Sequence, residues 1–330
     1  MTRIDKAIDI SGSYTKASSF WIVFGLLIAG FFIGQFVSSL FLFAFAYSSG
    51  VGSEILERPE LIYESITQSQ LLISQAFYTF VFTFFTPWFY LKVIANKKIG
   101  VLHRPTKSVA LPVVLTLLAT VAFMAVNAFL VEWNANIDLP DGALEDAFKQ
   151  MEEDLATLTE RFTKFDNFGS FLLGFVVIAV LPGIGEEFMF RGVLQNSLHK
   201  YAGNKHVAIW LTAFLFAAIH LQFYGLVPRM MLGVLFGYLY VWSGNLWLPI
   251  ISHIANNGIA VTMAYYAQVS ETDINIDDPE SLPLWVGIVA LVLCLGLLFL
   301  FRNHYLRSNS SNEPLASSLP DHHGTPGTDH

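Results

Sequence analysis

Residues 168–191 read FGSFLLGFVVIAVLPGIGEEFMFR, an apolar run that ends in two adjacent carboxylates and an arginine. In mid-bilayer each charge costs about 2.5–3.5 kcal/mol, so three unpaired charges would cost about 8–10 kcal/mol. Glu187 and Arg191 are four residues apart, a spacing that allows an ion pair on one helix face. Glu186 then lies on a neighbouring face, about 100° away. The pattern predicts that Glu186 is available as a general base in an apolar setting.

The composition places most of the chain in the membrane. Of its 330 residues, 54% are hydrophobic and only 13% are charged, whereas soluble domains carry about 25% charged residues. The net charge of −8 offers no basic stripe for nucleic acid. The predicted fold class is therefore all-α, a polytopic integral membrane protein with about eight transmembrane helices that enclose an intramembrane polar cavity.

Apolar runs between charged links predict where the membrane spans lie. The fourth predicted span contains Pro182-Gly183, where we expect a bend, and the fifth to seventh have links short enough for partial re-entry. Basic and acidic links alternate along the chain, which predicts a multi-pass protein of the plasma or inner membrane with both termini in the cytoplasm. The predicted spans are 20–47, 71–94, 109–131, 168–198, 207–222, 226–243, 245–267 and 283–301.

These features divide the chain into four predicted parts. Residues 1–164 hold N-terminal membrane helices and an outer amphipathic segment at about 141–165. Residues 165–267 hold the candidate catalytic helices, and residues 268–307 hold the last transmembrane helix. Residues 308–330, rich in Ser, Pro, Gly, Asp and His, are predicted to be a disordered cytoplasmic tail.

Two pairs of glycines lie four residues apart inside apolar spans. They are Gly30 with Gly34, and Gly233 with Gly237. Small residues at this spacing allow close helix contact, so we predict packing within the molecule, with a dimer face as the alternative.

Two histidines lie well inside apolar spans, His220 and His253, and Asn257 follows His253 by one helical turn. At 1.5 Å per residue, Glu186 and His220 lie about 20 and 22 Å from the inner basic loop. Asn257 and His253 lie about 18 and 12 Å from the next inner turn. We therefore expect these four side chains to line one cavity.

A carboxylate and an imidazole that face one water can remove its proton and direct it at a carbonyl. Glu186 and His220 are the candidates for this step, and Asn257 with His253 for stabilising the oxyanion. A zinc site is the alternative, with Glu186, His220 and His253 as ligands and Glu187 as base. We favour the version without a cofactor. The sequence lacks His-Glu-x-x-His and has no Asp in a predicted span, so zincin-type and paired-aspartate sites are not expected.

Three motifs in order resemble the CAAX-protease and bacteriocin-processing family of membrane proteases, which includes the type II CAAX prenyl endopeptidases. They are Glu186-Glu187-x-x-x-Arg191, Phe216-x-x-x-His220 and His253-x-x-x-Asn257. The resemblance covers about residues 165–267. It implies an all-helical intramembrane endopeptidase in which Glu186 and His220 activate water while His253 and Asn257 bind the oxyanion. Glu187, Arg191 and Phe216 match motif positions with supporting roles.

The implied partners are membrane lipid and a peptide or protein substrate, which in some members of the family is lipidated. A proton-coupled transporter or immunity factor that uses the same Glu and His residues as a proton relay is the alternative function.

Overall fold

The computed structural model describes residues 6–58, 61–104, 110–137, 140, 142–270 and 283–310. The backbone of the described residues is almost entirely helical, and an isolated antiparallel bridge joins His103 to Asn245. Helices cover most of the described residues in each predicted span, which confirms the all-α fold class. The predicted disordered tail and the link before the last span lie largely outside the described residues.

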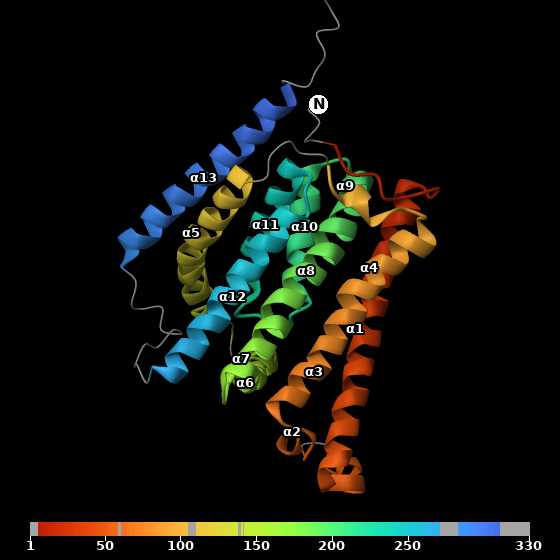
Figure 1. The fold of residues 1–330 in the computed structure, drawn as a ribbon, viewed down its shortest axis with the longest axis vertical. Coiled ribbons are helices and arrows are strands. Elements are labelled where there is room, and N and C mark those ends of the chain that lie inside the picture. Colours follow the sequence, from red (N-terminus) through yellow and green to blue (C-terminus); the bar gives the residue numbers. More distant parts are fainter. Residues whose placement is uncertain are drawn as a thin grey trace, which may run out of the picture.

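The N-terminal half contributes two long rods and one straight helix (Figure 1). The first rod runs outward from residue 16, and the second returns beside it. The π-helical segments within the second rod continue the same rod rather than break it. The elements are α1 (Lys16–Ala46), η2 (Tyr47–Val51), η3 (Gly52–Leu56), α2 (Leu61–Ser65), α3 (Gln68–Thr79), η4 (Phe80–Phe85), α4 (Thr86–Phe89), η5 (Tyr90–Ile94), η6 (Ile99–Leu102), α5 (Ala110–Ala135) and α6 (Ala143–Thr163).

The C-terminal half contains a segmented rod followed by four helices. The rod combines α-helical and π-helical segments over residues 168–202. A chain reversal at residues 219–225 separates the next two helices. The elements are α7 (Phe168–Gly174), η7 (Phe175–Val180), α8 (Leu181–Glu187), η8 (Phe188–Gln195), α9 (Asn196–Ala202), α10 (Lys205–Ala218), α11 (Leu226–Ser243), α12 (Trp247–Val269) and α13 (Leu284–Ser310).

Six helical stretches among the described residues are long and apolar enough to cross a membrane. Many of their large apolar side chains are exposed, such as Phe32 and Phe36, as expected for surfaces that face lipid. The start of α1 and the end of α13 lie at the same end of the molecule (Figure 1). Which end faces the cytoplasm stays a prediction.

Helix α10 is shorter than its predicted span of 207–222. Its 14 residues are about 21 Å long, less than the hydrocarbon thickness of about 30 Å. The helix ends at the reversal of residues 219–225, before it is long enough to cross, as expected for a span that re-enters in part. Within a membrane, non-helical backbone is tolerated only when it is buried in protein or lines a cavity.

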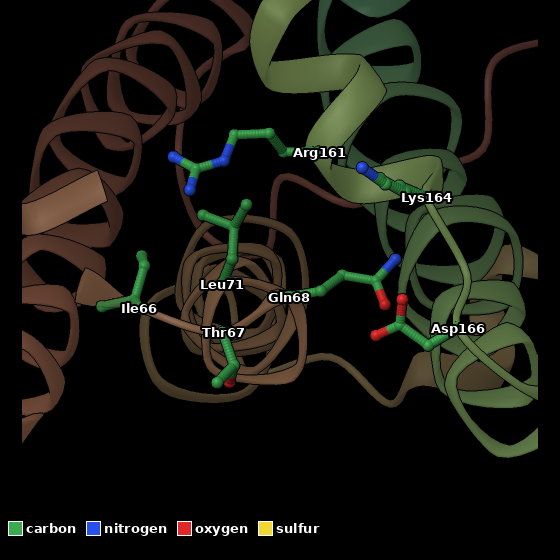
Figure 2. Close-up of a pocket in the computed structure, with 7 residues that line it drawn as sticks. All are labelled: Ile66, Thr67, Gln68, Leu71, Arg161, Lys164 and Asp166. Atoms are coloured by element: carbon green, nitrogen blue, oxygen red, sulfur yellow. The ribbon is translucent and has the colours of Figure 1, made fainter. Parts of the chain in front are cut away.

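Helix α6 occupies the predicted amphipathic segment. It contacts α3, α7 and α12 at the lower end in Figure 1. Its Leu158 and Phe162 pack on an apolar cluster that includes Ile55 and Leu71. Figure 2 shows the pocket between the start of α3 and the end of α6, into which Arg161 and Lys164 extend. Helix α6 therefore covers one end of the helical core.

Both glycine pairs pack within the molecule. A Cβ at Gly30 would collide with Thr86, and one at Gly34 would lie 3.1 Å from the Tyr78 ring. In the same way, a Cβ at Gly233 would crowd Ala213 of α10, and one at Gly237 would crowd Ile209 of the same helix. The predicted intramolecular packing is confirmed.

We predict that Gly30→Val destabilises the protein by about 1–3 kcal/mol, because the side chain overpacks the contact between α1 and α4. Thermal unfolding of the detergent-solubilised protein measures the effect. Gly25→Val is the matched control in the same helix, since a Cβ there meets nothing within 4 Å. An equal effect of the two substitutions would contradict the packing argument.

Candidate active site

Glu187 and Arg191 form the predicted ion pair. Arg191 Nη1 lies 2.7 Å from Glu187 Oε1, and both side chains are 0% exposed. Nη2 of the same guanidinium donates to the Gly233 carbonyl at 3.0 Å. The guanidinium carbon also lies 4.8 Å from the ring centre of Phe216 and 5.2 Å from that of Phe236. The charge is therefore compensated by a carboxylate, a carbonyl and two aromatic faces.

The glycines of α11 explain how Arg191 reaches a backbone carbonyl. A Cβ at Gly233 would lie 3.3 Å from Arg191 Nη2 and 3.0 Å from the Ala213 Cβ. One turn away, Gln195 Nε2 donates to the Gly237 carbonyl at 3.3 Å. Both glycines thus let α11 approach the rod closely enough for its carbonyls to bind side chains.

His253 extends this pair to a third helix. Its Nδ1 lies 2.9 Å from Glu187 Oε1, and its side chain is 3% exposed. The imidazole stacks on Phe236 with ring centres 5.0 Å apart. Glu187 Oε1 accepts from Arg191, so in its contact with His253 the hydrogen lies on Nδ1. The nitrogen Nε2 is left facing the site.

Glu186 lies on the other side of His253. Its Oε2 is 3.9 Å from His253 Nε2, and its side chain is 17% exposed. This distance exceeds a direct hydrogen bond and suits one bridging water. A Cβ at Gly183 would collide with Ile254, and one at Gly185 with Thr83, so these glycines allow the close packing around α8. The two adjacent carboxylates thus have different surroundings, as their spacing predicts.

His220 follows the last turn of α10. Its Nδ1 lies 2.7 Å from the Phe216 carbonyl, which can only accept, so Nδ1 carries the proton and Nε2 is free. The next residue, Leu221, has φ of 55° and ends the helix sharply.

Phe216 links the two histidines. Its ring centre lies 5.1 Å from that of His220 and 6.0 Å from that of His253. The same ring packs under the Arg191 guanidinium. Phe216 therefore has an observable packing role, with its carbonyl orienting one imidazole and its ring contacting the other.

Asn257 binds the rod close to Pro182. Pro182 has no N–H for the carbonyl four residues earlier, and Asn257 Nδ2 donates to that carbonyl, of Ile178, at 3.1 Å. Its Oδ1 accepts from Asn256 at 3.0 Å. An amide nitrogen has two hydrogens, so one N–H of Asn257 is engaged by the rod.

The sequence analysis missed two side chains near Glu186. Tyr78 and Arg229 both lie within electrostatic reach of its carboxylate. Arg229 could have been found from the sequence, because it is a charged residue in an apolar span, the same signal that singled out Glu186. Tyr78 lies in the N-terminal half and carries no comparable signal.

The geometry does not assemble the ligand set of the zinc alternative. Among the described residues, no three His, Cys, Asp or Glu side chains are grouped so that they could hold a metal ion. Glu186, His220 and His253 therefore do not fit zinc in this arrangement.

The comparisons with known proteins fall on this site. Residues 168–259 match the family model of Rce1-like type II CAAX prenyl endopeptidases. The uncharacterized protein YpbD of Bacillus subtilis is 29% identical over 82 residues, which are 24% of this chain and 39% of YpbD. The membrane-embedded CAAX protease MroQ of Staphylococcus aureus is 32% identical over 89 residues, 26% of this chain and 36% of MroQ.

The matched segment thus spans less than half the length of either curated relative. No solved structure matches the chain. All seven predicted site residues lie within residues 168–259. The resemblance predicted from the three motifs is confirmed: this segment is similar to the Rce1-like type II CAAX prenyl endopeptidases.

Proposed function

We propose that the protein is an intramembrane endopeptidase in which Glu186 and His220 activate a water molecule. One observation carries the proposal. The Glu186 carboxylate is partly exposed beside His253, whose other nitrogen is fixed by a fully buried ion pair. A site with one available carboxylate and two oriented imidazoles has the groups that hydrolysis needs.

In the proposed reaction, Glu186 takes a proton from water, and His220 Nε2 orients the same water by a hydrogen bond. The oxygen attacks the carbonyl carbon of the peptide. His253, when protonated at Nε2, and the second N–H of Asn257 donate to the oxyanion. Glu186 then returns the proton to the leaving nitrogen, so that one water is consumed and a carboxylate and an amine are released.

Glu187 and Arg191 have a positioning role in this scheme. Glu187 Oε1 accepts from both Arg191 and His253. The carboxylate therefore fixes the tautomer and orientation of the imidazole, and Arg191 compensates its charge. Neither side chain needs to contact substrate.

The same proposal assigns the remaining parts of the chain. Residues 165–267 form the catalytic unit, and residues 1–164 contribute to substrate choice. The substrate is a peptide or protein that enters from the membrane, and a lipidated segment is one source. The proposed orientation has both termini in the cytoplasm.

Glu186→Gln should lower the rate of peptide hydrolysis by about 10²–10⁴-fold, because the general base is lost while the shape is kept. Mass spectrometry of products from a reporter peptide measures the rate. Glu153→Gln, on the exposed side of α6, is the matched control. A transporter would instead lose pH-dependent flux on Glu186→Gln and yield no cleavage product with either protein.

Activity should persist in the presence of a strong zinc chelator and should still require Glu186. The measurement is the hydrolysis rate of the purified protein with and without chelator, and again after added zinc. Loss of activity with chelator and its recovery with zinc would instead support the ligand set of Glu186, His220 and His253.

Arg191→Met should destabilise the protein by about 3–5 kcal/mol, because it leaves the Glu187 charge buried without its partner. The double variant Glu187→Gln with Arg191→Met removes both charges and should recover most of the stability. Thermal unfolding of the two variants and the wild type measures the difference. Equal stability of Arg191→Met and the wild type would show that the pair does not support the fold.

A further inference from the structure

The reversal between α10 and α11 is held by one buried side chain from α5. Asn134, 1% exposed, donates from Nδ2 to the Phe223 carbonyl at 3.2 Å. Its Oδ1 accepts from the Val227 backbone at 2.8 Å. A single amide therefore satisfies two backbone groups of the reversal and holds it in one conformation.

Arg229 follows this reversal in the first turns of α11. Its Nη2 donates to Gln222 Oε1. Its Nη1 is buried and has no hydrogen-bond partner among the described residues. The guanidinium folds back over Gly225, where an added Cβ would collide with Nη1. A buried donor on a charged group that lacks a partner is costly, and it is typical of a group that receives a ligand.

Hydrogen bonds place Arg229 close to α6 and to His220: Arg229 binds Gln222, which follows His220 by two residues and binds Glu152 of α6. The charge of Arg229 interacts with those of Glu186 and Glu152, and it also acts on His220. Gln222 Nε2 donates to Glu152 Oε1 at 3.1 Å, so the amide separates the guanidinium from the α6 carboxylate. Glu152 Oε2 is also buried without a hydrogen-bond partner among the described residues. Of the two terminal nitrogens of Arg229, Nη2 binds Gln222 and Nη1 has no hydrogen-bond partner among the described residues. Gln222 is a neutral side chain, which a charged ligand can displace.

Helix α6 contacts the reversal at a second place. Phe148 of α6 stacks on Phe223 with ring centres 4.9 Å apart and planes 8° from parallel. The two contacts, Phe148 with Phe223 and Glu152 with Gln222, hold α6 over the reversal that carries His220 and Arg229. A substrate group that reaches Arg229 must therefore compete with Glu152.

We propose that Arg229 is an anion-binding subsite of the catalytic site and that it holds a carboxylate of the substrate within a few residues of the scissile bond. This assignment rests on the proposed function for the position of that bond. A guanidinium matches a planar carboxylate with two parallel hydrogen bonds, and Nη1 and Nη2 present that fork. A doubly charged phosphate fits less well, because the carboxylates of Glu186 and Glu152 already interact with this guanidinium. The carboxylate is either the C-terminus of the peptide or an acidic side chain near it.

The test uses the full-length protein in detergent and an N-terminally labelled hexapeptide of alanine and leucine. The peptide is made as the free acid, as the amide, and as the amide with Glu at the last position. Fluorescence anisotropy measures each dissociation constant. The wild type should bind at least one carboxylate form about tenfold more tightly than the plain amide, the value expected for one hydrogen bond to a charged group. The stronger of the two carboxylate forms identifies the source.

Arg229→Gln should bind all three peptides equally, and Arg229→Lys should keep part of the preference. Gly225→Ala should weaken it, because the added methyl group displaces the guanidinium. Glu152→Gln should tighten binding of the carboxylate forms by removing their competitor, whereas Glu153→Gln should leave it unchanged. Equal binding of acid and amide by the wild type, or no binding of any peptide, would overturn the assignment.

The measurement does not depend on cleavage. A carboxylate preference that disappears in Arg229→Gln, in a protein that hydrolyses no peptide, would support the subsite and contradict the protease. Cleavage that requires Glu186, by a protein that binds acid and amide peptides equally, would support the protease and contradict the subsite. If Arg229→Gln does not fold, the tighter carboxylate binding expected for Glu152→Gln still tests the assignment.

Discussion

A charge in hydrocarbon persists only where the surrounding groups replace the water that it has lost. In this protein the requirement falls on the pair of Glu187 and Arg191, which is fully buried at 2.7 Å. Arg191 donates to the Gly233 carbonyl of α11, and two aromatic rings lie against its guanidinium. Glu187 in turn accepts from His253 of α12. The packing of three helices around the site therefore depends on one ion pair. Buried pairs add little net stability but are strongly destabilising when broken, so the pair fixes the arrangement of the helices more than it strengthens the fold.

Two neighbouring carboxylates acquire different tasks from this arrangement. Glu187 binds Arg191 and His253 through Oε1, whereas Glu186 keeps some exposure and faces an imidazole nitrogen across a gap of 3.9 Å. The two residues are adjacent in the helix, so their side chains point about 100° apart around its axis and reach different surroundings. The same principle distinguishes acid from base in other hydrolases with paired carboxyl groups, where surroundings and not residue type assign the role.

Local spacing and hydropathy were enough to predict the approximate spans and the Glu187–Arg191 pair, because each depends on residues within a few turns of one helix. Contacts between distant segments could not be predicted in that way. The bond from Asn257 to Ile178 requires knowledge of which carbonyl Pro182 leaves free and which helix passes beside it. The early end of α10 depends on Asn134, more than eighty residues away along the chain. Arg229 carries the same sequence signal as Glu186, a charge inside an apolar span, but its contacts with Gln222 and Gly225 follow only from the fold.

The π-helical segments η7 and η8 lie on either side of α8. Such a turn accommodates one residue more than an α-helical turn. The middle of the rod is therefore rotated relative to both of its ends, which remain packed against their own neighbours. In evolutionary terms, gain or loss of one residue in such a turn could change which side chain faces the cavity without altering the membrane-spanning framework. A fold of this kind can diversify its chemistry by insertion and deletion as well as by substitution.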